Sequence, residues 1–414
     1  MKKQLLIFMI SAMDIVACYS STRESSLNPH KGERNSDIVD SGSDFDSGEN
    51  TDIDIDSDTD IDTDSDNNTD TDTDGETEIE FCRGCTCEES GNALGCFVPA
   101  SGDTVPDDNN GMFEYYMGCR EEDDLLCAKN EKPWHRVLLS PFEIQLCEVT
   151  NFEYIKFLNY YSIGENPTGC GPDKDQKCHY TGLDNDMSIY FEGSGWHAES
   201  GKELISVHSV SWDGAWSFCR WIAGGVYSGR LPTEAEWEFA TRGSKHDGWP
   251  ENEEYFRYPF GNTVSANQIN YVQNGDPWDQ DSSDPYFHDG ITPRLFFDGT
   301  TRVLEEWNWP DRTLDTYDTI SNASAGSGAY DMAGNLFEWV RDWYSPTYCG
   351  DAGDCGKTEY VENPEGPLSG DRRVIRGGGR GNPADDARAT RRIPVESDLM
   401  RNVVGFRCIR QPRN

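Results

Sequence analysis

The chain has 414 residues and a formal net charge of −41, so it is long enough for one large domain or two ordinary ones with tails. Residues 36–80 contain 19 Asp and Glu and no Lys or Arg, but the remainder of the chain is also acidic. Such a surface repels nucleic acid phosphates and no basic stripe offsets it, so we expect no nucleic acid partner.

The first residues predict export. Two lysines precede the apolar stretch 5–13, which is too short to span a bilayer and is typical of a secretory signal. Residues 15–18 (IVAC) resemble a bacterial lipobox. We therefore predict a lipoprotein-type signal peptide over 1–18 and a lipid anchor at Cys18, in an extracytoplasmic protein of the outer membrane that faces the periplasm or the cell surface. The alternative is an ordinary cleaved signal or an N-terminal tail.

The next segment is low in apolar residues. Residues 19–80 are rich in Asp, Ser and Thr, and Asp recurs at every second position through much of 52–74. Self-repulsion and the lack of apolar bulk predict a disordered, extended linker that holds a folded part away from a surface.

Fourteen cysteines in an exported chain predict disulfides. Residues 81–111 are interpreted as a small Cys-rich segment, where disulfides are favoured over zinc because the spacing matches no strong zinc signature. Its cysteines are Cys82, Cys85, Cys87 and Cys96. Cys147 has no evident partner. Three further pairs of cysteines predict disulfides that each close a surface loop. They are Cys119 and Cys127, Cys170 and Cys178, and Cys349 and Cys355.

Capping signals predict three helices in the globular part. Thr150 and Glu153 have capping-box spacing before an apolar run. Thr233 and Glu236 repeat this pattern, and Ser211 precedes a further periodic run.

Little else in this part is periodic. Residues 244–328 predict long ordered loops, and a fold of this kind usually needs metals or disulfides to hold it. Trp212, Trp216 and Trp221 have helical spacing and are interpreted as core, with a ligand groove as the alternative.

The stretch 328–344 combines aromatic residues with a turn signal. Asp331 and Glu338 flank Gly334, so a tight turn could bring the two carboxylates together. Clusters of carboxylate and carbonyl oxygens suit Ca²⁺. The alternative is a turn followed by an aromatic-rich strand in the core.

Several blocks of sequence resemble one family. Over residues 112–412 the chain is similar to the formylglycine-generating enzyme (sulfatase-modifying factor) domain. The resemblance implies an α+β fold with low regular secondary structure, a variant of the C-type lectin fold. The blocks are 148–154 (EVTNFEY), 207–212 (VHSVSW), 229–243 (GRLPTEAEWEFATRG), 258–262 (YPFGN), 328–344, 373–379 (RVIRGGG) and 405–408 (GFRC).

The same resemblance implies structural calcium and a long-range disulfide. It predicts that Cys219 bonds to Cys408 and so joins the second helix to the last strand. The ligands of one calcium site would be Asp331, Gly334, Leu336 and Glu338. Those of a second would be Asn270, Tyr271, Asp284 and Tyr286.

The active-site segment departs from the family pattern. Formylglycine-generating enzymes carry two copper-binding cysteines after the RGG block, but no cysteine lies between Gly377 and Phe406 here. Soft thiolates suit Cu(I) and oxygen ligands do not replace them well, so copper is not expected. The segment is instead densely charged, which predicts either a rebuilt pocket for a polar ligand or a salt-bridged surface turn. The candidate pocket residues are Arg380, Asp385, Arg388, Arg391 and Arg392.

These features together predict a cell-envelope lipoprotein with a non-catalytic domain. It would bind an unknown protein or glycan ligand, or serve as a structural scaffold. The alternative is an enzyme that uses the same groove, either as a formylglycine-generating oxidase or with altered chemistry. Fold resemblance alone does not decide between these.

Overall fold

The structure is a computed structural model. It describes residues 95–100, 111–170, 177–179, 188–223, 227–243, 255–271, 290–303, 316–320, 327–348 and 360–412. All described residues belong to one compact unit of the chain, Cys85–Asn414. The predicted signal peptide, the lipid anchor at Cys18 and the linker 19–80 therefore lie outside the described residues.

Three α-helices form where the capping signals predicted them. Thr150 closes a capping box with Glu153. Thr233 does the same with Glu236, and Ser211 caps the remaining helix. Each cap satisfies amide groups that the first turn of a helix leaves unbonded. The helices are α1 (Asn151–Tyr160), α2 (Trp212–Ile222) and α3 (Glu234–Arg242).

The described strands are short and form several small sheets. One sheet has the order β1 (Phe97–Pro99), β4 (Glu143–Gln145), β15 (Ile409–Pro412), β7 (Tyr227–Arg230). Another has the order β13 (Ile393–Val395), β12 (Arg373–Arg376), β10 (Phe337–Trp343), β14 (Val404–Gly405), with β10 and β14 parallel. The others are β11 (Val361–Glu362) with β3 (His135–Leu139) and β2 (Phe113–Met117), β5 (Ile189–Glu192) with β6 (Gly195–Ala198), and β8 (Thr301–Val303) with β9 (Thr316–Asp318). The predicted α+β fold with few regular elements is confirmed.

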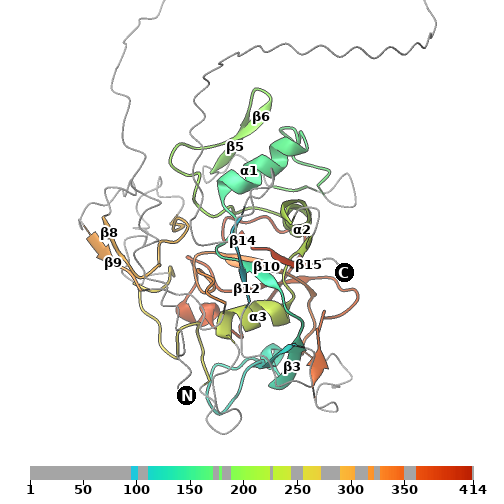
Figure 1. Cartoon of the computed structure of the whole chain (residues 1–414), viewed down its shortest axis with the longest axis vertical. Helices are drawn as coiled ribbons and strands as arrows, with labels where there is room; N and C mark the ends of the chain where they lie inside the picture. Colours follow the sequence, from blue (N-terminus) through green and yellow to red (C-terminus); the bar gives the residue numbers. More distant parts are fainter. Residues whose placement is uncertain are drawn as a thin grey trace, which may run out of the picture. The chain divides into compact units, whose positions relative to one another are not determined.

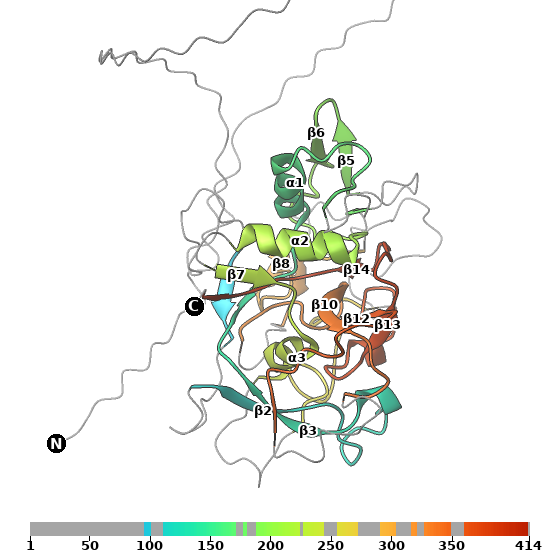
Figure 2. The same ribbon diagram turned by 90° about the vertical axis from the view of Figure 1, so that its right-hand side faces the viewer.

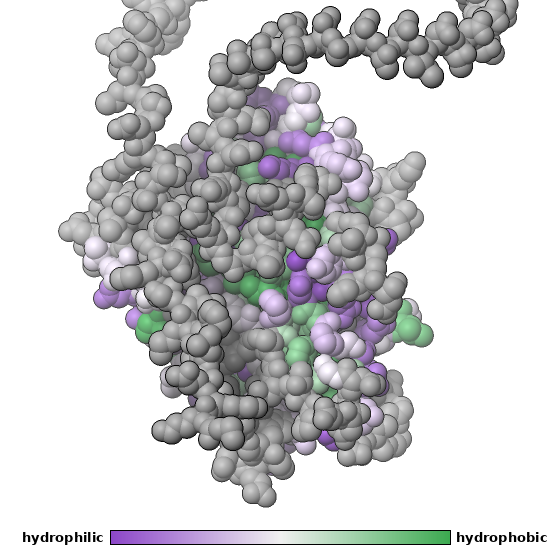
Figure 3. Space-filling view, viewed as in Figure 1, coloured by the Kyte–Doolittle hydropathy of each residue, from purple (hydrophilic) through white to green (hydrophobic). Residues whose placement is uncertain are grey.

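The elements pack around α2 and α3. Figures 1 and 2 show α1 with the β5–β6 hairpin on one side of α2, and α3 beside β2 and β3 on the other. One hydrophobic cluster lies between α1, α2 and the β10–β12 sheet, and a second joins α3 to β2 and β3. On the face in Figure 3, hydrophobic residues form small patches among hydrophilic ones. Within the described ranges, no helix has the length and apolar character needed to cross a bilayer.

Strand β1 moves the predicted domain boundary. Phe97 pairs with Gln145 of β4 and is buried, as is Cys96 before it. Residues 97–99, which the sequence assigned to a separate segment over 81–111, thus form an edge strand of a sheet of the main domain. The described strand β1 therefore packs with the domain that the sequence predicted to begin at residue 112.

Three predicted disulfides are present. Cys219 of α2 bonds to Cys408, 189 residues later. The bond joins the helix to the residue that directly precedes β15. The loop staples Cys119–Cys127 and Cys170–Cys178 also form. The predicted Cys349–Cys355 pair lies outside the described residues. Of the three tryptophans predicted to be core, Trp212 is buried, and Trp216 and Trp221 are partly buried.

Candidate functional site

The turn before β10 is built from residues in the left-handed region. Asp331, Gly334 and Asn335 have φ values of 56°, 80° and 60°. A Cβ atom at Gly334 would lie 2.5 Å from the carbonyl oxygen of Asn270, so only glycine fits there. Asp331, Gly334, Leu336 and Glu338, the predicted ligands of the first calcium site, are all buried in this turn and the start of β10.

Glu148 is a central residue of this site that the sequence analysis did not single out. Its carboxylate accepts hydrogen bonds from Asn335 Nδ2 at 2.5 Å and from the Leu336 amide at 3.2 Å. Burial, and then the charges of Glu338 and Asp331, raise the pKa of Glu148 well above its usual range. The family block 148–154 was the available signal, but it did not reveal that Glu148 reaches a turn almost 190 residues away.

Glu338 is paired with an arginine. Arg407 donates to both carboxylate oxygens, with a shortest distance of 2.7 Å, and Trp237 Nε1 donates to Oε2 at 2.8 Å. Three donors on one carboxylate leave little room for a second cation. The described residues contain no group of three or more His, Cys, Asp or Glu side chains arranged to hold a metal. Calcium at this turn would have to share Glu338 with Arg407, and it stays a prediction.

The second predicted calcium site is only partly described. Asn270 is buried, and its Nδ2 donates to the Gly290 carbonyl. Its own carbonyl accepts from the Asn335 amide at 2.9 Å, so Asn270 joins the loop to the first site. Tyr271 follows it, while Asp284 and Tyr286 lie outside the described residues.

Two arginines of the charged segment are internal. Arg388 is buried and donates to Glu131 at 2.7 and 2.9 Å, and Arg392 is buried and donates to both Glu234 oxygens at 2.5 Å. They belong neither to an open pocket nor to a surface turn, which corrects both interpretations for these residues. The physical reason is that each guanidinium meets a buried carboxylate, which compensates its desolvation.

The rest of the charged segment is closer to solvent. Asp385 is exposed, and Arg380 and Arg391 are partly exposed. Arg391 donates to Asp386 at 3.0 Å. The structure therefore separates the five candidate pocket residues into a buried pair and a group nearer the surface.

Helix α3 supplies carboxylates for this internal network. Arg376 donates to Glu234 at 2.8 Å and to Glu238 at 2.7 Å. Burial raises the pKa of Glu234, but Arg392 and Arg376 outweigh it and the net shift is downward. The segment that follows the RGG block is thus fastened to α3 by ion pairs.

Cys147 is the cysteine that the sequence left without an evident partner. It is a buried thiol outside the described disulfides. Burial raises the pKa of Cys147 to about 12, although the nearby Arg294 lowers it, so the thiol is protonated at neutral pH.

A family model described as the sulfatase-modifying factor enzyme 1-like domain matches residues 109–412. The chain is 27% identical to the formylglycine-generating enzyme of Streptomyces coelicolor over 302 residues, 68% of this chain and 82% of that protein. It is 30% identical to the inactive C-alpha-formylglycine-generating enzyme 2 of Mus musculus over 211 residues, 50% of this chain and 49% of that one.

The chain is also similar to part of a longer protein. It is 27% identical to the serine/threonine-protein kinase pkn1 of Chlamydia pneumoniae over 280 residues. These are 68% of this chain but 34% of the kinase, so this chain matches about a third of that protein's length.

Proposed function

Because the chain belongs to the sulfatase-modifying factor family, we propose that it uses the family domain as a non-catalytic, ligand-binding scaffold at the cell envelope. The observation that carries this proposal is the segment between Gly377 and Phe406, which contains no cysteine. Copper-dependent oxidation of a substrate thiol needs thiolate ligands for Cu(I) in this place.

The contacts of the same segment support the proposal. Arg388 and Arg392 are committed to Glu131 and Glu234, which are 257 and 158 residues away. Removing one partner from such a buried pair typically costs about 3–5 kcal/mol, so these arginines have a structural role. Similarity to a mouse protein that is named as inactive also supports a domain kept for a purpose other than catalysis.

Attachment and metal content complete the proposal. A lipid anchor at Cys18, with residues 19–80 as a tether, would hold the domain near a membrane surface. Calcium bound at Asp331, sharing Glu338 with Arg407, would stabilise the turn before β10 and take no part in a reaction.

An oxidation assay tests the proposal directly. Full-length protein is incubated with copper(I) and a cysteine-containing substrate peptide of formylglycine-generating enzymes, and aldehyde formation is followed by mass spectrometry. The Streptomyces coelicolor enzyme is the positive control. We expect no aldehyde and no stoichiometric copper in this chain. Stoichiometric copper together with aldehyde would instead establish an oxidase.

A further inference from the structure

We propose that the loop closed by the Cys119–Cys127 disulfide is a docking loop, which inserts Leu125 into an apolar pocket of a partner protein whose rim carries basic side chains. This docking role rests on the binding function proposed above and gives it a surface and a kind of partner.

The polarity of the loop is the reverse of what solvation favours. Asp124 is 0% exposed, whereas Leu125 is 94% exposed and Leu126 is 43% exposed. Acidic side chains are rarely fully buried, and burying a leucine is favourable. A loop that turns its aspartate inward and its leucines outward therefore needs specific contacts to hold it.

Those contacts are present around Asp124. Its carboxylate lies 3.2 Å from the guanidinium groups of both Arg257 and Arg388. It also accepts a hydrogen bond from the Leu126 amide at 3.0 Å, and its carbonyl accepts from Cys127. The loop is thus anchored at its centre and closed at its ends. Binding through Leu125 would cost little conformational entropy, because the loop is already ordered.

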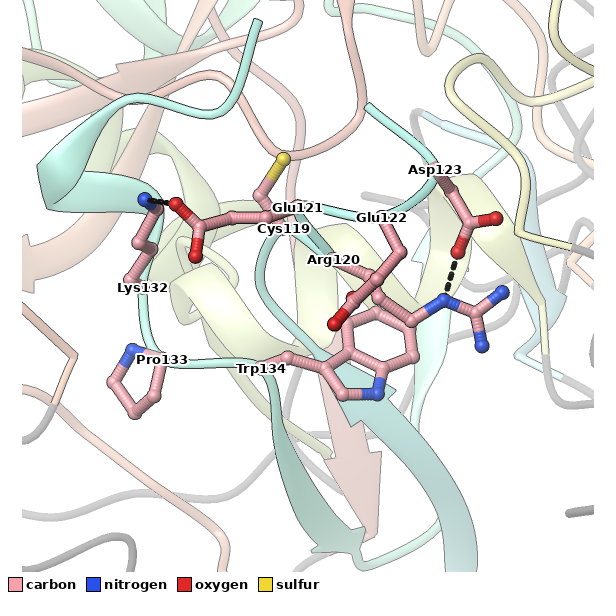
Figure 4. Close-up of a pocket in the computed structure, with 8 residues that line it drawn as sticks. All are labelled: Cys119, Arg120, Glu121, Glu122, Asp123, Lys132, Pro133 and Trp134. Atoms are coloured by element: carbon pink, nitrogen blue, oxygen red, sulfur yellow. Dashed lines mark hydrogen bonds and ion pairs between the residues drawn. The ribbon is translucent and has the colours of Figure 1, made fainter. Parts of the chain in front are cut away.

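A cavity of about 710 Å³ lies beside the loop and is lined by residues 119–123 and 132–134. Figure 4 shows Trp134 among the acidic side chains. Glu122 lies between Glu121 and Asp123, and each of these two neighbours forms an ion pair. Those pairs are Glu121 with Lys132 and Asp123 with Arg120. Within the described residues Glu122 has no ion-pair partner. The Trp134 ring is already in contact with the Arg120 and Arg242 guanidinium groups. A partner's lysine or arginine entering this cavity would meet the Glu122 carboxylate.

Charge selects the kind of occupant. Glu121, Glu122 and Asp123 are exposed and immediately precede the anchor Asp124. Lys132 and Arg120 already pair with Glu121 and Asp123, so Glu122 is the carboxylate that a basic side chain on a partner's rim complements. An anionic phospholipid surface would be repelled by Glu122. A second copy of the chain would carry the same net charge of −41, and like charges oppose association. The occupant is therefore a protein with a basic surface.

Photo-crosslinking tests the docking loop. Purified full-length protein carrying a photo-reactive residue at position 125 is irradiated with an envelope extract of its native cells, and the adducts are identified by mass spectrometry. The same residue at position 368 is the matched control, because Leu368 is also fully exposed, at 101%. Each protein that crosslinks only at 125 is then purified and titrated against the wild type and the variants.

The expected result is an identified protein with a basic surface whose Kd rises at least about tenfold for Leu125→Ser, because a buried leucine anchor is lost. Glu122→Lys should also raise the Kd and weaken its dependence on salt, and Leu368→Ser should leave it unchanged. Circular dichroism verifies that the variants fold, and no loss is expected at such exposed positions.

Other outcomes would overturn the docking loop. These are equal crosslinking at 125 and 368, no adduct at 125, an adduct only with a second copy, binding only to vesicles containing 30% anionic phospholipid, or a Kd that Leu125→Ser leaves unchanged. The oxidation assay tests the proposed non-catalytic function independently of the docking loop. Formylglycine formation would contradict the non-catalytic role, and an unchanged Kd would contradict the docking loop alone.

Discussion

The Arg407 guanidinium lies 2.7 Å from the Glu338 carboxylate, and both side chains are buried. Arg407 also donates to the backbone carbonyls of Tyr330 and Asp331 at 2.8 and 3.2 Å. It therefore connects the last part of the chain to both ends of the turn that precedes β10. The position where the family resemblance implies calcium already contains one cation, supplied by the protein.

Replacing Arg407 should destabilise the fold strongly. We expect Arg407→Leu to lower the free energy of unfolding by about 3–5 kcal/mol, because it leaves the buried Glu338 charge without its partner. Urea unfolding of the full-length protein measures this change. Arg341→Leu is the control, because its pair with Glu365 is partly exposed and its loss should cost about 1 kcal/mol or less. Equal effects of the two variants would contradict a dominant role for the buried pair.

Asp342 should make stability fall as the pH rises. Burial, and then the charge of Glu234, raise the pKa of Asp342 from its usual 3.8 to about 8. An acid whose pKa is higher in the folded state than in the unfolded state stabilises the fold at low pH. That contribution is lost as the pH rises from the unfolded-state pKa to the folded-state pKa. We expect Asp342→Asn to gain stability relative to the wild type between pH 5 and pH 8. Urea unfolding at several pH values measures the difference.

Glu236→Gln is the control for this pH dependence. Burial raises the pKa of Glu236, but Arg230 outweighs it and the net shift is downward. Its stabilising contribution is therefore lost only when the pH falls below about 4.5, outside the measured window. A stability difference between Asp342→Asn and wild type that stays constant from pH 5 to pH 8 would show that Asp342 is ionised throughout.

Local signals were predictable from the sequence. Thr150 and Thr233 are followed at the third position by glutamate, and a capping box needs nothing beyond its own turn. The Cys119–Cys127 staple could be predicted for the same reason, since its cysteines are only eight residues apart. The disulfide of Cys219 with Cys408 could be predicted only through the family resemblance.

The ion pairs were not predictable because their partners are far apart in the chain. Arg388 and Arg392 lie among other charged residues in the sequence, which favours a solvent-exposed position. In the structure Arg388 pairs with Glu131 and Arg392 pairs with Glu234, and all four are buried. The buried Asp124 beside the exposed Leu125 contradicts the usual rule that apolar residues are inside. Such reversals depend on tertiary contacts, which periodicity and spacing do not encode.

The long-range disulfide should contribute more stability than a loop staple. Cys219–Cys408 spans 189 residues and Cys170–Cys178 spans eight. A longer closed loop restricts the unfolded chain more, so the double alanine variant of the first pair should lose about 2–3 kcal/mol more than that of the second. Calorimetry without reductant compares their Tm values. A larger loss for Cys170–Cys178 would mean that this staple supports folded-state contacts as well.

Calcium should stabilise the turn before β10 if it binds there. We expect calcium to raise the Tm of the full-length protein and a chelator to reverse this, because a ligand that binds only the folded state stabilises it. Asp331→Asn should abolish the response, since it removes a carboxylate that Arg407 does not neutralise directly, while Asp385→Asn at the exposed segment should keep it. Elemental analysis of the dialysed protein should give one or two calcium equivalents. A Tm that does not respond to calcium would leave Arg407 as the cation that supports Glu338.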